Sequence, residues 1–447
     1  MLSIMDALQI YFLTYNCGLA LIDVEHFSRH FFDALPVTDS PSSPDLIVLS
    51  LQEIAPIPYA FLGGAFLTPY LAVFAQAVDR ATSHRLGSRY VNILTDHSGM
   101  TGLMVFARSD VVDHLSPPDI ARVGFGPQEI GNKGAIGVRL SYSPSEPRLA
   151  DVDLTLIAAH FVPMEDGVTQ RNENWRSLVE RLVFIGSENA RPTNDDGNEN
   201  ENESESAALL SGSSTRSSHP GIFAPSGYLF LGGDLNYRTA DRFPTKNDYL
   251  RYPKANAEPG DPLHFSELLK HDQLKREMEL SHCFHGLKEA PVTFPPTYKY
   301  HAEAQAAARD PSTSDRVPEW IWSSHRWPSW CDRILFLETP PGRGEESKVR
   351  ITNYDALPVS PTSDHRPVAL TVSIPFTERR ALHDPHTVAP FPIDPNWASR
   401  RDAACRKEYI AGCIAYLGMT WEGNGLALGT TFAILGAWFV VRSMFSS

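Results

Sequence analysis

Short apolar runs recur along the first 376 residues and limit the chain to folds built on sheets. Each run is four to seven residues long and rich in β-branched side chains, which is typical of buried strands. The runs lie at residues 8–14, 45–51, 90–94, 102–107, 135–140, 154–159, 228–231, 333–337 and 368–374. Between them, residues 169–185 place Trp175, Leu178, Leu182 and Ile185 on one helical stripe. We therefore expect an α/β fold with more than one sheet.

The charge distribution argues against a nucleic-acid-binding protein. The 447 residues carry a formal net charge of -14, and residues 187–206 alone hold seven acidic residues against one arginine. Binding to a nucleic-acid backbone normally needs a basic face, and these totals give no sign of one. Residues 189–218 contain few apolar side chains, so we expect a disordered insertion there. One domain with appendages is the simplest organisation.

The cysteines indicate a reducing environment. The chain has five of them, widely scattered and without the paired spacing of a zinc site or a disulfide framework. Residues 1–22 are apolar but contain Asp6 and Gln9 and no basic start, so they fit a first strand better than a signal peptide. We expect a cytosolic catalytic domain.

The C-terminus carries a candidate membrane span. Residues 423–441 form an uncharged run of 19 residues, which is enough for a helix across a thin bilayer. A buried amphipathic helix is the alternative, but the run is apolar on every face. We expect a catalytic domain at 1–376, a linker at 377–422 and a membrane tail anchor at 423–441.

Polar residues of catalytic type follow several of the expected strands. They are Asn16, Glu53, His160, Asp234 with Asn236, and His365, the last just before the final strand. Taken singly, each has an ordinary explanation, such as a turn cap, a surface carboxylate or a core histidine. Loops beyond strand ends often build active sites, so the repetition predicts that these residues meet in one pocket. One amide, two carboxylates and two histidines suit metal-assisted phosphate hydrolysis.

The residue types suggest separate roles in such a reaction. Mg²⁺ prefers oxygen ligands, which Glu53 and Asn16 can supply. Asp234 and Asn236 can act as base and orienter of the attacking water. His365 and His160 can donate to the phosphoryl oxygens.

Nine motifs together resemble the inositol polyphosphate 5-phosphatases, over roughly residues 8–376. They are Thr14-Tyr15-Asn16, Leu51-Gln52-Glu53, Gly131-Asn132-Lys133-Gly134, Ala159-His160, Arg171-Asn172, Gly233-Asp234-Leu235-Asn236-Tyr237-Arg238, Phe294 to Tyr300, Trp330-Cys331-Asp332-Arg333 and Ser363-Asp364-His365-Arg366-Pro367. The Gly-Asp-x-Asn and Ser-Asp-His motifs also occur in related DNase-like nucleases and sphingomyelinases. The Asn-Lys-Gly, Pro-Pro-Thr-Tyr-Lys-Tyr and Trp-Cys-Asp-Arg motifs are far more specific.

The resemblance implies a four-layer α/β/β/α sandwich of two packed mixed sheets, here followed by a transmembrane helix. It also implies further roles, in which Asp332 orients His365 and Asp364 lies near the metal. Tyr298 and Lys299 would contact the neighbouring 4-phosphate. Lys133 and Asn132 would line the inositol pocket. Where the family commonly has a further lysine, this chain has Ser324, His325 and Arg326, of which Arg326 can substitute.

These inferences predict a Mg²⁺-dependent phosphatase that removes the 5-phosphate of phosphatidylinositol 4,5-bisphosphate, resembling the tail-anchored fungal members of the family. The expected partners are a phosphoinositide lipid and a membrane, with no nucleic acid. The expected location is the endoplasmic reticulum, with the catalytic domain in the cytosol. A nuclease or sphingomyelinase of the same superfamily is one alternative. A scaffold that binds lipid headgroups without catalysis is another, but no catalytic residue is lost.

Overall fold

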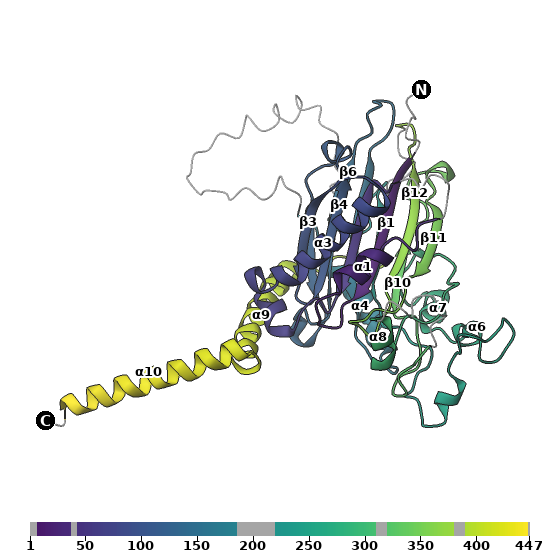
Figure 1. Cartoon of the computed structure of the whole chain (residues 1–447). Coiled ribbons are helices and arrows are strands. Elements are labelled where there is room, and N and C mark those ends of the chain that lie inside the picture. Colours follow the sequence, from purple (N-terminus) through teal and green to yellow (C-terminus); the bar gives the residue numbers. More distant parts are fainter. Residues whose placement is uncertain (1–6, 37–42, 186–219, 310–319, 380–388, 446–447) are drawn as a thin grey trace, which may run out of the picture.

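Two six-stranded sheets packed face to face form the centre of the molecule, and helices cover their outer faces (Figure 1). This computed structural model describes residues 7–36, 43–185, 220–309, 320–379 and 389–445. The strand orders are β11-β12-β1-β2-β4-β3 in the first sheet and β5-β6-β7-β8-β10-β9 in the second. The expected four-layer sandwich is confirmed. The insertion expected at 189–218 lies outside the described residues.

All nine apolar runs form strands. The first sheet contains β1 (Ala7–Asn16), β2 (Leu46–Gln52), β3 (Tyr90–Ser98), β4 (Thr101–Arg108), β11 (Arg350–Ala356) and β12 (Val368–Pro375). The second contains β5 (Asp119–Gly124), β6 (Gly134–Tyr142), β7 (Val152–His160), β8 (Tyr228–Asp234), β9 (Lys288–Glu289) and β10 (Asp332–Phe336). β1 pairs in parallel with β2, and β7 pairs in parallel with β8. Three strands, β5, β9 and β11, were not predicted.

Alternating side chains of the central strands build the core on both faces of each sheet. In β1, Ile10 and Phe12 point between the sheets, while Tyr11 and Leu13 point toward the covering helices. The two sheets are in contact where β1 packs against β8. A side chain at Gly232 would lie 2.4 Å from the Phe12 ring, so this position accepts only glycine without a shift.

Helices supply the two outer layers. α1 (Val24–His30) and α3 (Thr68–Arg85) pack on the first sheet, and α4 (Val168–Arg181) and α7 (Gln273–Glu279) pack on the second. The remaining short helices are α2 (Ile57–Leu62), α6 (Phe265–Leu269) and α8 (Ala302–Ala308). The helix expected at 169–185 ends at Arg181, because Leu182 turns into an extended conformation. Leu182 remains in the core, whereas Ile185 is 43% exposed.

Two helices end the described chain. α9 (Trp397–Met419) lies within the segment expected to be a linker, yet it packs against α2. α10 (Trp421–Phe445) extends away from the sandwich (Figure 1). Within the described residues, α10 is the one helix long and apolar enough to cross a membrane, and none of its apolar window is buried.

Candidate active site

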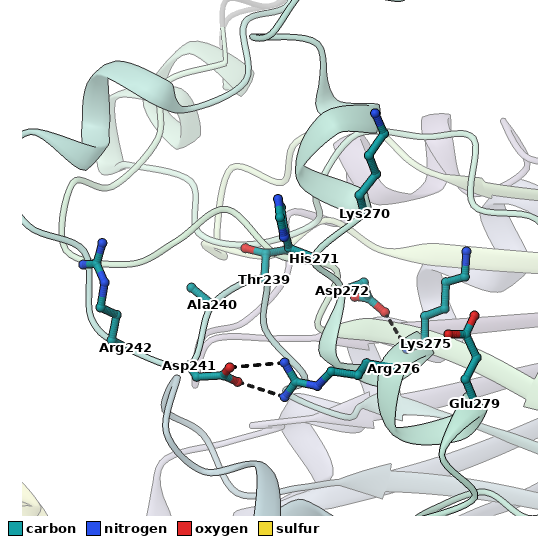
Figure 2. Close-up of a pocket in the computed structure, with 10 residues that line it drawn as sticks. All are labelled: Thr239, Ala240, Asp241, Arg242, Lys270, His271, Asp272, Lys275, Arg276 and Glu279. Carbon is teal, nitrogen blue, oxygen red and sulfur yellow. Dashed lines mark hydrogen bonds and ion pairs between the residues drawn. The ribbon is translucent and has the colours of Figure 1, made fainter.

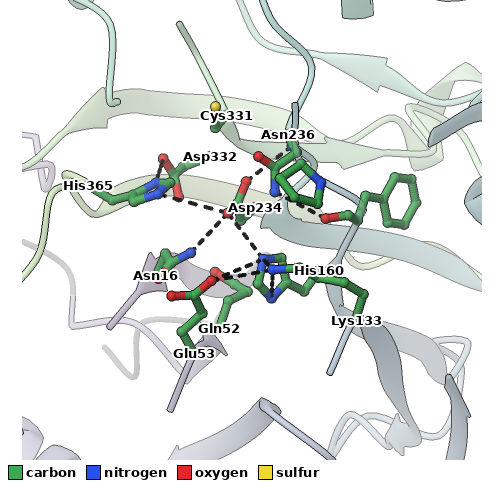
Figure 3. A network of polar contacts seen from close by, with 12 residues as sticks. Asn16, Gln52, Glu53, Lys133, His160, Asp234, Asn236, Cys331, Asp332 and His365 are labelled. Atoms are coloured by element: carbon green, nitrogen blue, oxygen red, sulfur yellow. Dashed lines mark hydrogen bonds and ion pairs between the residues drawn. The ribbon is translucent and has the colours of Figure 1, made fainter. Parts of the chain in front are cut away.

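The carboxyl ends of four central strands meet at one edge of the sandwich. β1 and β2 run in parallel, as do β7 and β8, and the two pairs pack against each other across the core. This arrangement brings Asn16, Glu53, His160 and Asp234 together (Figure 3). The predicted convergence of strand-end residues is therefore present.

Asp234 lies at the centre of this group and is buried. Its Oδ2 accepts a hydrogen bond from Asn16 Nδ2 at 2.9 Å and lies 3.3 Å from His160 Nε2. Its Oδ1 accepts from the backbone N–H of Asn236 at 3.1 Å. Burial favours the protonated acid, but the bond with His160 and the charge of His365 outweigh it and hold the pKa of Asp234 well below its usual range. Asp234 is therefore a carboxylate at neutral pH.

His365 forms a buried pair with Asp332. Its Nδ1 lies 2.9 Å from Asp332 Oδ2, which also accepts a hydrogen bond from Thr297 Oγ1 at 2.6 Å. Burial disfavours the charged ring, but Asp332, followed by Asp234 and Asp364, outweighs burial and raises the pKa of His365 to about 9. The ring is therefore an imidazolium at neutral pH, and its Nε2 lies 4.0 Å from Asp234 Oδ2.

Lys133 joins the two sheets at the site. Its Nζ lies 2.6 Å from His160 Nε2 and 3.3 Å from Glu53 Oε1. Burial and the charge of Lys133 lower the pKa of His160, so this ring is neutral. The Glu53 side chain is 29% exposed, the highest fraction in this group. Lys133 was expected in an inositol pocket, and the structure places it between Glu53 and His160.

The Gly-Gly-Asp-Leu-Asn sequence explains how the chain turns at the end of β8. A side chain at Gly233 would lie 2.0 Å from the Ala159 carbonyl oxygen, so only glycine fits this approach of β8 to β7. Asn236 has a φ of 58°, a conformation that asparagine tolerates better than most residues. Its Nδ2 donates to the Phe161 carbonyl at 3.1 Å, and its Oδ1 accepts from Arg238. The Asn236 side chain is thus occupied in holding the loop.

A second group of charges lies beside His365. Lys299 Nζ pairs with Asp364 Oδ2 at 2.6 Å, and Asp364 Oδ1 lies 3.9 Å from His365 Nε2. The Tyr298 ring is 4.5 Å from the His365 ring. Burial lowers the pKa of Lys299, but Asp364 outweighs it and raises the pKa, so Lys299 is a cation. Arg326 is close enough for its positive charge to lower the pKa of Lys299, which partly opposes the effect of Asp364.

Asn132, which is predicted to line the inositol pocket, lies in the loop just before β6. Its Oδ1 lies against Gly126, where an added Cβ would be only 1.7 Å from it. This buried oxygen has no hydrogen-bond partner among the described residues.

The donor atoms at the site fit a hard divalent cation. Ligand atoms of Asp234, Asp332 and His365 lie within 4.8 Å of one another, a group whose composition could hold a metal ion. His365 and Asp332 already form a hydrogen bond with each other, however, and Asp332 also accepts a hydrogen bond from Thr297. The partly exposed carboxylate of Glu53, with Asn16 beside Asp234, offers the oxygen atoms that Mg²⁺ or Ca²⁺ prefer. The site therefore fits a metal bound through oxygen.

A buried polar scaffold behind the site was not predicted. Arg171 donates to the carbonyl of Met164 at 2.6 Å and to Gln273 Oε1 at 2.7 Å. The same Gln273 oxygen accepts from the backbone N–H of Arg238 at 2.8 Å. Arg171 belongs to the Arg171-Asn172 motif, which could have identified it, but Gln273 stands in no motif.

A separate cavity of about 710 Å³ lies beside α7 (Figure 2). Arg276 pairs there with Asp241, and Arg242 and Lys270 pair with Asp248 and Glu267. None of the residues that line this cavity belongs to the convergent group. The cavity is therefore distinct from the candidate active site.

Comparisons with known proteins point to one group of phosphatases. Residues 13–371 match the Endonuclease/Exonuclease/phosphatase family 2. The chain is similar to the type II inositol polyphosphate 5-phosphatase 15 of Arabidopsis thaliana, with 29% identity over 318 residues, 68% of this chain and 25% of that protein. It is also similar to the phosphatidylinositol 3,4,5-trisphosphate 5-phosphatase 2B of Danio rerio, with 28% identity over 282 residues, 61% of this chain and 18% of that protein. The chain thus spans a quarter or less of these two relatives.

A solved structure has the same fold. It is the crystal structure of the inositol polyphosphate 5-phosphatase domain of SPsynaptojanin in complex with inositol (1,4)-bisphosphate and calcium ion. The TM-score is 0.55 at 20% identity, covering 91% of this chain and 90% of that one.

Proposed function

The chain belongs to the endonuclease/exonuclease/phosphatase family, and from this premise we propose that it is an inositol polyphosphate 5-phosphatase acting on phosphatidylinositol 4,5-bisphosphate. Its curated relatives carry the names of inositol polyphosphate and phosphoinositide 5-phosphatases. One observation carries the substrate assignment. Two cations lie side by side, the His365 imidazolium and the Lys299 ammonium, joined by the Asp364 carboxylate between them. Two neighbouring phosphates of one inositol ring present the complementary pair of charges.

The His365 imidazolium donates to the 5-phosphate that is cleaved. Asp332 fixes the ring through Nδ1, so its Nε2 proton is free to point toward Asp234 and the substrate side. A charged donor held in place before the reaction stabilises the charge on the phosphoryl oxygens without reorganisation. His160, which is neutral and held by Lys133, supports Asp234 rather than the phosphate.

Asp234 orients the attacking water and takes its proton. The water oxygen bonds to phosphorus, and the bond from phosphorus to the inositol oxygen breaks. That oxygen takes up a proton from solvent, and Asp234 gives the proton of the attacking water back to solvent. A carboxylate with so low a pKa is a weak base, but the loose transition state of phosphoryl transfer requires little proton removal. The main contribution of Asp234 is therefore the position and orientation of the water.

Mg²⁺ is the proposed cofactor, with Glu53 and Asn16 as the residues that would hold it. When bound, the ion would neutralise charge on the phosphoryl oxygens. Lys133 lies against Glu53 and contributes a further fixed positive charge at this end of the site. The metal role of Asp364 remains a prediction, since its carboxylate is paired with Lys299.

Lys299 and Tyr298 bind the 4-phosphate, with Arg326 as an additional cation. The Lys299 side chain is 36% exposed and can turn from Asp364 to an incoming phosphate. α10 holds the enzyme at a cytosol-facing internal membrane, for which we propose the endoplasmic reticulum.

The test is substrate turnover by the full-length chain in detergent micelles, with Mg²⁺ or with a chelator. It is measured as inorganic phosphate from the inositol compounds, phosphocholine from sphingomyelin and nucleotides from DNA. The panel contains phosphatidylinositol 4,5-bisphosphate, inositol 1,4,5-trisphosphate, sphingomyelin and DNA. We expect metal-dependent release from the first two only. Turnover of sphingomyelin or DNA alone would assign the chain to another branch of the family, and no turnover at all would favour a scaffold.

A further inference from the structure

α9 is packed onto the catalytic domain along its length. On one side, Gly412 lies so close to α2 that an added Cβ would be 3.0 Å from Phe61 Cβ. One turn further on, the Tyr416 ring meets the Tyr59 and Phe66 rings at centroid distances of 6.5 and 5.2 Å. α2 begins four residues after Glu53. α9 therefore supports the segment that follows this predicted metal ligand.

The same helix forms hydrogen bonds with the loop that precedes Lys133. Glu408 Oε1 accepts a hydrogen bond from the backbone N–H of Gly131 at 2.5 Å. Eight residues earlier on α9, Arg400 Nε donates to Glu129 Oε1 at 2.9 Å. Gln128 and Glu129 have φ values of 55° and 69°, in a region that non-glycine residues rarely adopt. Such a loop needs bonds from outside to keep its shape.

Gly131 connects Glu408 to both sides of the active site. Lys133, two residues on, contacts Glu53 and His160. The Gly131 carbonyl accepts from the N–H of Met100 at 2.9 Å, and the Met100 carbonyl accepts from the N–H of Ile54 at 3.3 Å. Ile54 is the residue after Glu53. A side chain at Gly131 would lie 2.9 Å from both Glu408 Oε1 and Gly99, so the contact is tight.

We propose that α9 is a clasp that sets the position of Lys133, and that Glu408 is a positioning residue for the reaction. The inference rests on the proposed function, because Lys133 matters only if the site works on a charged substrate. The Lys133 ammonium contacts a carboxylate and an imidazole at once, so a small shift of Lys133 weakens its contacts with both. Positioning errors of this kind reduce rate without loss of the fold. Residues 397–419 are accordingly part of the enzyme.

Two variants of Glu408 separate the hydrogen bond from the charge. Glu408→Gln keeps an oxygen that can accept from Gly131 N–H, whereas Glu408→Ala leaves that N–H without a partner. The matched control is Asp402→Ala, an exposed acidic residue on the same helix whose side chain meets Arg401. The substrate is dioctanoyl phosphatidylinositol 4,5-bisphosphate, and the enzyme is the full-length chain in micelles. We expect Glu408→Ala to lower kcat about fivefold, which is the rate change expected from the loss of one typical hydrogen bond. Glu408→Gln and Asp402→Ala should stay near the unmodified chain.

A double-mutant cycle tests whether the effect passes through Lys133. In the background of Lys133→Met, Glu408→Ala should cause no further loss, because the group that it positions is gone. Independent losses that multiply would overturn the proposal and assign Glu408 a general structural role.

Hydrogen–deuterium exchange tests the contact between Glu408 and the loop without any assay of activity. Amides of residues 126–134 should exchange faster in Glu408→Ala than in Asp402→Ala, with β7 unchanged in both. Equal exchange in the two variants would contradict the clasp whatever the activity. An unmodified chain that is inactive on every inositol phosphate would contradict the proposed function and leave the clasp to be decided by exchange.

Discussion

Asp234 shows how much of the site depends on a single charge. Its carboxylate lies within 4.0 Å of nitrogen atoms from four residues, which are Asn16, His160, His365 and Asn236. Asp234→Asn keeps the shape and removes the charge, so it should lower kcat on phosphatidylinositol 4,5-bisphosphate by about 10²- to 10⁴-fold, the usual range for a positioned proton acceptor. The measurement is phosphate release, with circular dichroism to show that the variant is folded. A folded variant with near-normal turnover would remove Asp234 from the reaction.

We predict that Lys299 sets the preference for a substrate with a neighbouring phosphate. Lys299→Ala should reduce kcat/KM for phosphatidylinositol 4,5-bisphosphate about tenfold or more, since a charge-assisted contact is lost. A substrate that carries a 5-phosphate without a 4-phosphate should lose much less. Arg326→Ala provides the comparison, because Arg326 is a second cation close enough for its charge to act on Lys299. Equal losses on both substrates would show that Lys299 acts elsewhere or only supports Asp364.

At the scale of elements, β1 and β8 pack closely where Gly232 faces the Phe12 ring. Gly232→Ala should destabilise the fold by about 1–3 kcal/mol, because the new methyl group meets the Phe12 ring. Gly418→Ala is the control, since it adds a methyl group within α9 with no atom within 4 Å. Urea unfolding of the two variants provides the comparison. A Gly232→Ala protein as stable as the control would mean that the sheets separate easily there.

The central strands could be predicted because they are buried on both faces and read as continuous apolar runs. β11 and β5 could not, since each is an edge strand with polar or charged residues on its open face. β9 is only two residues long. The site residues were found because they follow predictable strands or stand in motifs. Gln273 and Glu408 act through backbone groups distant in sequence, and no local pattern marks such contacts.

For the whole molecule, the principal question is what α10 does. Its apolar side chains are exposed over most of its length, which is costly in water and favourable in a bilayer. The full-length chain should therefore resist extraction from membranes by alkaline carbonate, and a chain ending at Thr420 should be released. Microscopy of the full chain then tests the endoplasmic reticulum assignment. A full chain released by carbonate would contradict the anchor.

The position of the truncation matters because α9 belongs to the folded unit. A chain ending at Thr420 keeps the contacts of Glu408 and Gly412, so it should retain activity on soluble substrates. A chain ending at Phe376 loses both contacts and should be less active and less stable. Equal activity of the two truncated chains would show that α9 has no part in catalysis.

The most direct test of the whole account is the identity of the product from phosphatidylinositol 4,5-bisphosphate. The full-length chain with Mg²⁺ should convert this lipid to phosphatidylinositol 4-phosphate and inorganic phosphate in equal amounts, as measured by chromatography of the deacylated lipids. The Asp234→Asn protein, prepared in the same way, should leave the substrate intact. Formation of phosphatidylinositol 5-phosphate, release of a soluble headgroup, or equal product from the Asp234→Asn protein would contradict the account.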